Sequence, residues 1–389
     1  MKWKFYSLAF VAGMSILTAC SSDDNNDNDG NGGNGNGNEI ENGTILKGTI
    51  TSDVTLAAGN TYKLSGEYIV EEGATLHIEE GVKIIAVYDD IADYILVKQG
   101  GKINAVGTPD KPIVMTSEKE EPGAWGGIHI CGRAHTNAEG GKGSSEIGGA
   151  VYGGNDDADN SGTLQYIRLE YTGFAFDEEH EANGISFYGV GNGTIVDHCQ
   201  AYKGSDDGFE FFGGSVNVSN LVAVSCSDDS FDWTEGWNGK GTNLVAYQEA
   251  ESTLGYDCDC LMECDNNGNN AATPVAHPVL KNLILVGNGG SKQGIRLRAG
   301  TEVEIDNAKV CGKGQPLTVE TALTENALKN GTSKLTNITL TAELSSKEGI
   351  YTHADFIAVT SNKVNANLSY SSFEDIRKEC SWMNGSWVK

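Results

Sequence analysis

The chain has 389 residues, and its 54 acidic side chains outnumber its 27 basic ones, which gives a formal net charge of −27. This charge excludes nucleic acid and anionic lipid surfaces as direct partners, and it suits a protein that binds divalent cations. The 51 glycines, the 6 prolines and the recurring runs of Val, Ile, Thr and Phe favour an all-β protein with many turns.

The N-terminus has the pattern of an export signal. Lys2 and Lys4 precede an apolar run over residues 5–17, which is too short to span a bilayer comfortably. The run ends in Leu17-Thr18-Ala19-Cys20, which resembles a lipobox. We therefore expect residues 1–19 to be a lipoprotein signal peptide and Cys20 to receive the lipid that attaches the chain to a membrane. An ordinary secretory signal is the alternative.

A polar segment follows the lipid attachment site. Residues 20–43 are mostly Asn, Asp, Gly and Ser and contain almost no apolar side chain, so they are expected to form a disordered tether. The sequence Ser21-Ser22-Asp23-Asp24 resembles the export signal of surface lipoproteins in the Bacteroides group. That resemblance implies an outer-membrane, surface-exposed location. The remaining residues, 44–389, are long enough for one large core or two modest ones, and we expect them to form a single domain.

Eight cysteines follow Cys20. An even number in an oxidising compartment permits disulfides, and we expect some of them to pair. Others lie within apolar runs and are expected to be buried thiols. The spacing of Cys258, Cys260 and Cys264 matches no standard zinc motif.

A short pattern of alternating apolar and polar residues recurs with a period of about 22 residues. It occurs in Gly184–Gly189, in Gly208–Gly213 and in Ser230–Thr234, and copies at wider spacing follow around Met262 and Ile295. A companion strand pattern accompanies each copy. Two strands per period separated by Gly, Asn and Asp turns predict a right-handed parallel β-helix, in which one period is one coil. An antiparallel sandwich is the rival fold.

In such a stack, equivalent residues of successive coils lie above one another. The inward positions are expected to form two ladders, which are Ile185, Phe209, Phe231, Met262, Ile295 and Phe187, Phe211, Trp233, Cys264, Leu297.

Several segments carry a resemblance to a known group of proteins. The text EEGATLHIEEGVKI resembles the opening coils of right-handed parallel β-helix proteins. With SDDGFEFFGG, SDDSFDWTEGWNGK and GIRLRAG, the chain is similar to β-helix surface lipoproteins of Bacteroides-like bacteria. The resemblance implies the fold over nearly the whole chain after the tether, and it implies no settled activity.

Carboxylates recur at the coil period and are expected to gather on one outer face. Ser205-Asp206-Asp207 and Ser227-Asp228-Asp229 precede two of the repeats, and Asp259 extends this line. Like charges at this spacing repel one another unless a cation or a proton intervenes, and oxygen ligands at this density suit Ca²⁺. The expected metal ligands are Asp206, Asp207, Glu210, Asp228, Asp229, Asp232 and Glu263. The structural alternative is that the Asp pairs cap strands by accepting backbone hydrogen bonds.

Aromatic and basic residues complete the predicted surface. Tyr188 and Phe212 are expected to point outward beside the acidic row, and Trp237 follows in the adjacent turn. Exposed rings beside polar groups suit the faces of sugars. The alternative is that a loop such as residues 136–160 covers Phe212. Arg296 and Arg298 end the row and are expected to face a substrate.

Together these features predict a cell-surface lipoprotein that binds an extracellular glycan with the help of Ca²⁺. The acidic face resembles, in kind, those of pectate lyases and polygalacturonase-like hydrolases. A lyase or a glycoside hydrolase acting on acidic polysaccharide is therefore one alternative, with Asp207, Asp229 and Arg296 as candidate catalytic residues. Neither enzyme family's full motif is present. A non-enzymatic adhesion or structural protein is the other alternative.

Overall fold

The computed structural model describes residues 38–89, 91–176 and 180–389. The predicted signal peptide, Cys20 and the first part of the predicted tether lie outside these residues. Within them, no helix is long and apolar enough to cross a membrane. The first strand already includes Asn38 and Glu39, which pair with Val54 and Thr55. The coils therefore begin earlier than residue 44, because the end of the expected tether is hydrogen-bonded to the next coil.

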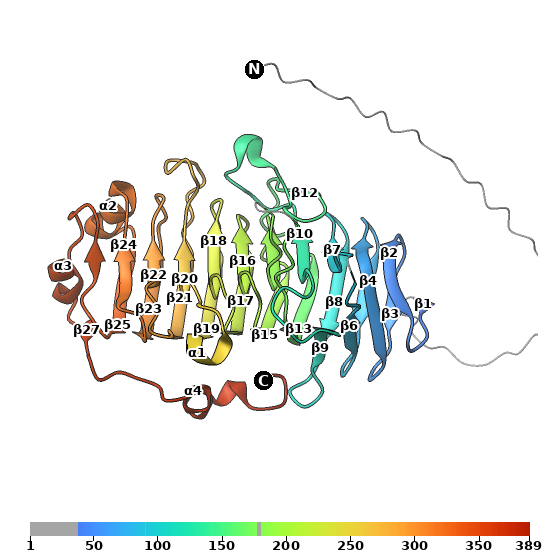
Figure 1. Ribbon diagram of the computed structural model, residues 1–389. Helices are drawn as coiled ribbons and strands as arrows, with labels where there is room; N and C mark the ends of the chain where they lie inside the picture. Colours follow the sequence, from blue (N-terminus) through green and yellow to red (C-terminus); the bar gives the residue numbers. More distant parts are fainter. Residues whose placement is uncertain (1–37, 90, 177–179) are drawn as a thin grey trace, which may run out of the picture. The chain divides into compact units, whose positions relative to one another are not determined.

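Almost all strands belong to one continuous parallel arrangement, in which the chain winds as a solenoid (Figure 1). Every pairing between coil strands is parallel, which confirms the parallel β-helix and excludes the antiparallel sandwich. One face consists of short strands. These are β7 (Tyr94–Val97), β10 (Ile128–Cys131), β14 (Ile185–Tyr188), β16 (Phe209–Phe212), β18 (Phe231–Thr234), β20 (Met262–Cys264), β22 (Gln293–Leu297), β24 (Gln315–Val319) and β26 (Ser345–Ser346).

Longer strands form the other two faces. They are β13 (Gly162–Glu170), β15 (Ile195–Tyr202), β17 (Asn217–Val224), β19 (Lys240–Tyr247), β21 (Val279–Val286), β23 (Glu304–Cys311), β25 (Lys334–Leu340) and the short β27 (Lys363–Val364). The first half of β13 pairs with β8 and its second half pairs with β9. One long strand therefore contributes to two faces of the coil and bends at the corner between them.

The remaining elements start the solenoid and decorate it. The first coils contain β1 (Asn38–Glu39), β2 (Ile45–Ile50), β3 (Val54–Leu56), β4 (Thr61–Val70), β5 (Thr75–Ile78), β6 (Lys83–Ala86), β8 (Lys102–Val106) and β9 (Ile113–Ser117). The decorations are η1 (Glu139–Gly141), the antiparallel pair β11 (Gly143–Ser144) and β12 (Val151–Tyr152), α1 (Glu251–Leu254), α2 (Ala322–Asn330), α3 (His353–Ala358), α4 (Phe373–Glu379) and η2 (Ser381–Met383).

The core is a column of side chains inside the coils, and its register is the predicted one. Ile185 pairs with Phe209 and Phe209 with Phe231, and the second ladder follows in the same strands. Met262 and Ile295 continue the column across wider sequence gaps. Successive aromatic residues stack face to face, with ring centroids 5.0 Å apart for Phe187–Phe211 and 5.6 Å for Phe209–Phe231.

The corner of each long strand depends on a residue in the left-handed backbone conformation. In four successive coils this residue is Asn220, Asn243, Asn282 and Asn307, all with positive φ. Asparagine adopts this conformation more readily than other residues with a side chain. The side chains also bond one another: each of the last three donates its Nδ2 to the Oδ1 of the preceding asparagine, over 2.8, 3.0 and 2.9 Å. This ladder fixes the corner and holds adjacent coils in register.

The expected disulfides do not form. All eight described cysteines are buried free thiols, which are Cys131, Cys199, Cys226, Cys258, Cys260, Cys264, Cys311 and Cys380. Cys199, Cys226 and Cys264 belong to the central column, where they pack as small apolar side chains. The expectation of pairing was wrong because most of these thiols are separate members of apolar clusters, where they fill space and do not meet another thiol.

The C-terminal segment returns along the outside of the coils after β27 (Figure 1). Its residues Ile376, Met383 and Trp387 pack on outward apolar side chains of the long strands, such as Val222 and Val245. At its end, Arg168 Nη1 donates to the carbonyl of Ser386 over 2.7 Å, and the backbone N–H of Ser386 donates to the carbonyl of Pro109 over 2.8 Å. The last residues therefore touch coils from the first half of the domain.

Replacing Trp387 by Ala should reduce the free energy of unfolding by about 3–5 kcal/mol, because this fully buried ring leaves a cavity when it is removed. Denaturant unfolding measures the change. The matched control is Leu323→Ala in α2, where the side chain is 49% exposed and the cost should stay near about 0.5 kcal/mol. An unchanged midpoint for Trp387→Ala would show that the segment does not stabilise the coils.

Candidate functional site

One cavity in the described part of the chain is lined almost entirely by carboxylates. Its volume is about 420 Å³, and we call it the acidic cleft. Ten acidic side chains and one arginine line it, which are Glu146, Glu181, Asp206, Asp207, Glu210, Asp228, Asp229, Asp232, Asp259, Glu263 and Arg296. All seven residues predicted as metal ligands are among them.

The coil register explains why these residues meet. Glu210, Asp232 and Glu263 occupy the same outward position of β16, β18 and β20, and they are direct neighbours across the strands. The turns that lead into these strands add Asp206 and Asp207, Asp228 and Asp229, and Asp259. Two rows of carboxylates therefore run side by side across three coils.

Some of these carboxylates also support the turns. Asp207 Oδ1 accepts the backbone N–H of Asp229 over 2.8 Å, and Asp229 Oδ1 accepts that of Cys260 over 2.6 Å. The strand-capping role that we considered as an alternative is therefore real for one oxygen of each side chain. It accounts for neither Glu210 nor Asp232, whose carboxylates belong to the strands.

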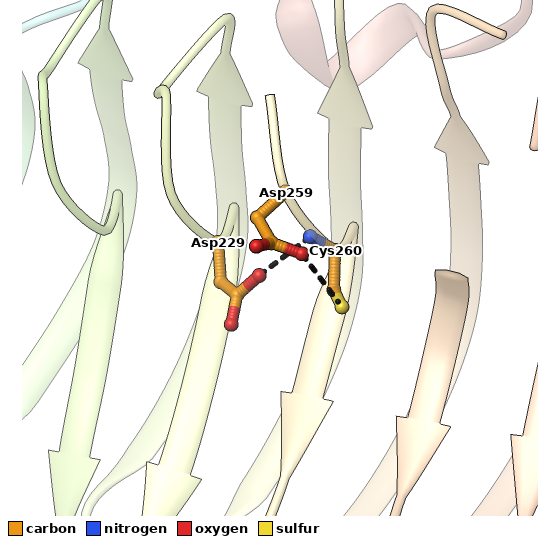
Figure 2. A group of neighbouring side chains, drawn as sticks. All are labelled: Asp229, Asp259 and Cys260. Carbon is orange, nitrogen blue, oxygen red and sulfur yellow. Dashed lines mark hydrogen bonds between the residues drawn. The ribbon is translucent and has the colours of Figure 1, made fainter. Parts of the chain in front are cut away.

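At one end of the cleft, Asp229 and Asp259 lie beside the thiol of Cys260 (Figure 2). The Cys260 thiol donates to Asp259 Oδ1 over 3.3 Å, and Lys292 forms an ion pair with the same carboxylate. Burial raises the pKa of the Cys260 thiol, so it stays protonated. Asp259 already has a cationic partner in Lys292, so less of its charge is available to a metal ion than that of the other carboxylates in the cleft.

The carboxylates of the cleft resist ionisation. Burial first, and then the neighbouring Asp228, raise the pKa of Asp206 to about 7. Burial and the neighbouring Asp259 raise the pKa of Asp228 to about 6. In the inner row, burial and adjacent carboxylates raise the pKa of Glu210 and Asp232 well above the usual range. The cleft therefore needs protons or cations to balance its charge.

The oxygen positions fit hard cations. Three groups of carboxylates place one oxygen from each member within 4.8 Å of one another. They are Asp206–Asp207–Asp228, Asp207–Glu210–Asp232 and Asp229–Asp232–Glu263. Because Ca²⁺ binds oxygen at about 2.3–2.6 Å, two of its ligands are at most roughly 5 Å apart. These residues would hold a Ca²⁺ ion, which would present its remaining coordination positions to a ligand in the cleft.

The two arginines at the end of the row are already paired. Arg296 Nη1 lies 3.0 Å from Glu263, and Arg296 Nη2 lies 3.3 Å from Glu320. Arg298 Nε lies 2.7 Å from Asp265, and its guanidinium also contacts Glu263. Arg296 lines the cleft whereas Arg298 does not. The predicted substrate-facing role thus keeps geometric support only for Arg296.

The predicted aromatic part of the surface is wrong. Tyr188 and Phe212 do point outward from β14 and β16, but they are 0% and 8% exposed. The insertion between β10 and β13 covers them: its Ile147, Ala150 and Tyr152 belong to the same buried cluster, and the Tyr152 and Tyr188 ring centroids lie 5.2 Å apart. The alternative that this loop covers Phe212 is therefore confirmed.

Trp237 is buried for a different reason. It is 1% exposed and belongs to the inner column, where it stacks on Phe211 with ring centroids 4.1 Å apart. Its Nε1 donates to the carbonyl of Val216 over 3.2 Å. None of the three predicted aromatic residues lines the acidic cleft.

Sequence reasoning missed two residues of the cleft. Glu146 comes from the insertion, and the Tyr188 hydroxyl donates to its Oε2 over 3.1 Å. Burial raises the pKa of Glu146 to about 7, although the Tyr188 hydrogen bond opposes this. Glu181 precedes β14. Neither residue repeats at the coil period, so no sequence signal marked them.

Comparison with known proteins agrees with this architecture. A family described as "Pectate-lyase like beta helix domain" matches residues 48–388. No curated protein and no solved structure matches the chain significantly.

Without divalent cations, stability should fall as the pH rises from about 4 to about 7. The folded protein holds the Asp206 proton up to a pKa of about 7, whereas an unfolded Asp releases it near about 3.9. The stabilisation by the Asp206 proton is therefore fully present below the unfolded pKa, and it is lost as the pH rises through the folded pKa. Thermal unfolding in EDTA across this range measures the effect.

The variant Asp206→Asn should raise the melting temperature at pH 8 in EDTA by about 2 °C or more, because one buried charge is removed. Glu348→Gln, an exposed acidic residue outside the cleft, should change it little. Equal stability of the wild type at pH 4 and pH 8 would contradict the electrostatic description of the cleft.

Proposed function

The chain belongs to the family of pectate-lyase-like β-helix domains, and on this premise we propose that it binds an extracellular glycan through Ca²⁺ held in the acidic cleft. The observation that supports this function best is the convergence of ten carboxylates on one cavity of about 420 Å³. The carboxylates of this cavity would repel an anionic sugar and would attract a neutral one only weakly. A bound cation would neutralise part of their charge and attract the oxygens of the sugar.

Ca²⁺ would link the protein and the sugar chemically. The carboxylates of adjacent coils provide some of the oxygen ligands of the ion, and a sugar carboxylate or hydroxyl group provides others. An acidic glycan suits this arrangement best, since its negative charge would otherwise be repelled by the cleft. Binding should therefore disappear when the cation is removed.

The proposed cellular setting follows from the sequence. With a lipid on Cys20 and a polar segment after it, the domain would stand at the outer face of the outer membrane. There the cleft would meet polysaccharides from outside the cell. Radiolabelled lipid incorporation that is lost in Cys20→Ala, and protease accessibility on whole cells, test this setting.

Affinity electrophoresis through gels containing acidic polysaccharides tests the binding function. Retardation should occur with Ca²⁺ and be lost in EDTA, and Glu210→Gln and Asp232→Asn should each weaken it at least about tenfold, since each removes a charged oxygen ligand. Glu348→Gln should bind like the wild type. Retardation that is unchanged in EDTA would contradict a Ca²⁺-mediated mode, and no retardation by any glycan would contradict the function.

A polysaccharide lyase is the second candidate, and the observation that favours it is Arg296 at the edge of the cleft. Burial lowers the pKa of the Arg296 guanidinium, but the ion pairs with Glu320 and Glu263 outweigh it and raise the pKa, so Arg296 is less able to act as the base that takes a proton from the sugar. Asp207 and Asp229 remain the carboxylate candidates for this activity. Incubation with polyuronates should produce unsaturated ends that absorb ultraviolet light if the chain is a lyase, and Arg296→Lys should abolish them.

A further inference from the structure

Two of the carboxylate groups in the cleft share one residue. Asp207, Glu210 and Asp232 form the first triad, and Asp229, Asp232 and Glu263 form the second. Asp232 lies between Glu210 and Glu263 because β18 lies between β16 and β20. One carboxylate has two oxygens, so Asp232 can offer one of them to each side.

The hydrogen bonding of Asp232 leaves it available for this role. Its Oδ1 is buried and has no hydrogen-bond partner among the described residues. An unpaired carboxylate oxygen in such a place is costly, unlike those of Asp207 and Asp229 that accept backbone N–H groups. A cation beside Asp232 would satisfy it.

A second unpaired oxygen lies near the first triad. Asn183 is 1% exposed, and its Nδ2 donates to Glu210 Oε2 over 2.6 Å and to Ser186 Oγ over 3.0 Å. Its Oδ1 is buried without a partner in the described structure. The amide nitrogen, and not this oxygen, faces Glu210, so Asn183 holds the Glu210 carboxylate in place and leaves its other oxygen for a cation.

The charge of the two triads matches two ions better than one. Their five carboxylates would carry a charge of −5 when ionised, and two divalent cations supply +4. Arg296 and Arg298 both contact Glu263, which belongs to the second triad only, and so they reduce the negative charge of the second triad more than that of the first. The two positions should therefore differ in affinity, with the tighter ion in the first triad.

We propose that the acidic cleft binds two divalent cations, one in each triad, and that the Asp232 carboxylate bridges them. The proposal rests on the cation-binding part of the proposed function and is independent of whether a glycan binds. The remaining groups are weaker candidates, because Asp206–Asp207–Asp228 has no buried unpaired oxygen and Asp259 is paired with Lys292.

Calorimetric titration of the full chain with Ca²⁺, without any glycan, tests the bridge. The wild type should bind two equivalents, and the number bound by each variant is compared with it. Glu210→Gln should remove one equivalent and leave the weaker ion, and Glu263→Gln should remove one and leave the tighter ion. Asp232→Asn should weaken both by at least tenfold. Glu348→Gln should remove none. Circular dichroism of each variant checks that the coils remain folded.

The proposal is overturned if Asp232→Asn loses no more Ca²⁺ than either single variant, or if Glu210→Gln and Glu263→Gln abolish the same single equivalent. These results are separable from the fate of the glycan function. Two equivalents without glycan retardation would refute glycan binding and keep the bridge. Glycan retardation with only one bound equivalent of Ca²⁺ would support glycan binding and refute the bridge.

Discussion

The backbone hydrogen bonds between successive coils are the interaction on which the rest of this structure depends. They place each residue directly beside its equivalent one coil away, at the spacing of neighbouring strands, about 4.8 Å. A residue type that repeats at the coil period therefore becomes a continuous row. Inside the coils the rows are Phe, Ile and Leu and form the core. On the outside the same rule assembles Glu210, Asp232 and Glu263 into a line of charge.

The same stacking that stabilises the core also forces the carboxylates of the cleft close together, which costs stability. Stacking aromatic rings is favourable, whereas stacking carboxylates at the same spacing is unfavourable unless their charge is neutralised. The chain places the unfavourable row where the core is well packed with Phe209, Phe231 and Trp233. The apolar column beneath can offset the repulsion above it, so the cleft can keep a high density of oxygen ligands.

The sequence allowed prediction of the rows that repeat in the short strands, although the repeated corner asparagines were not recognised in it. The two inward ladders and the outward positions of Glu210, Asp232, Glu263 and Arg296 follow from periodicity alone, and the strand register confirms them. Features that occur once were not predictable in this way. The insertion that covers Tyr188 and Phe212 has no periodic partner, and nothing in its composition tells where it packs. The cysteines misled for a related reason, since an even count says nothing about which thiols the core will separate.

The C-terminal segment has a consequence for how the domain comes apart. A solenoid whose coils touch only their neighbours can lose structure one coil at a time, starting at an end. Here Trp387 and Ser386 link the terminus of the chain to Tyr166, Arg168 and Pro109 in coils far from the last one. Fraying of the final coils must therefore also detach a strap that crosses the middle of the molecule. Because of this requirement, local opening of single coils is coupled into one larger unfolding event.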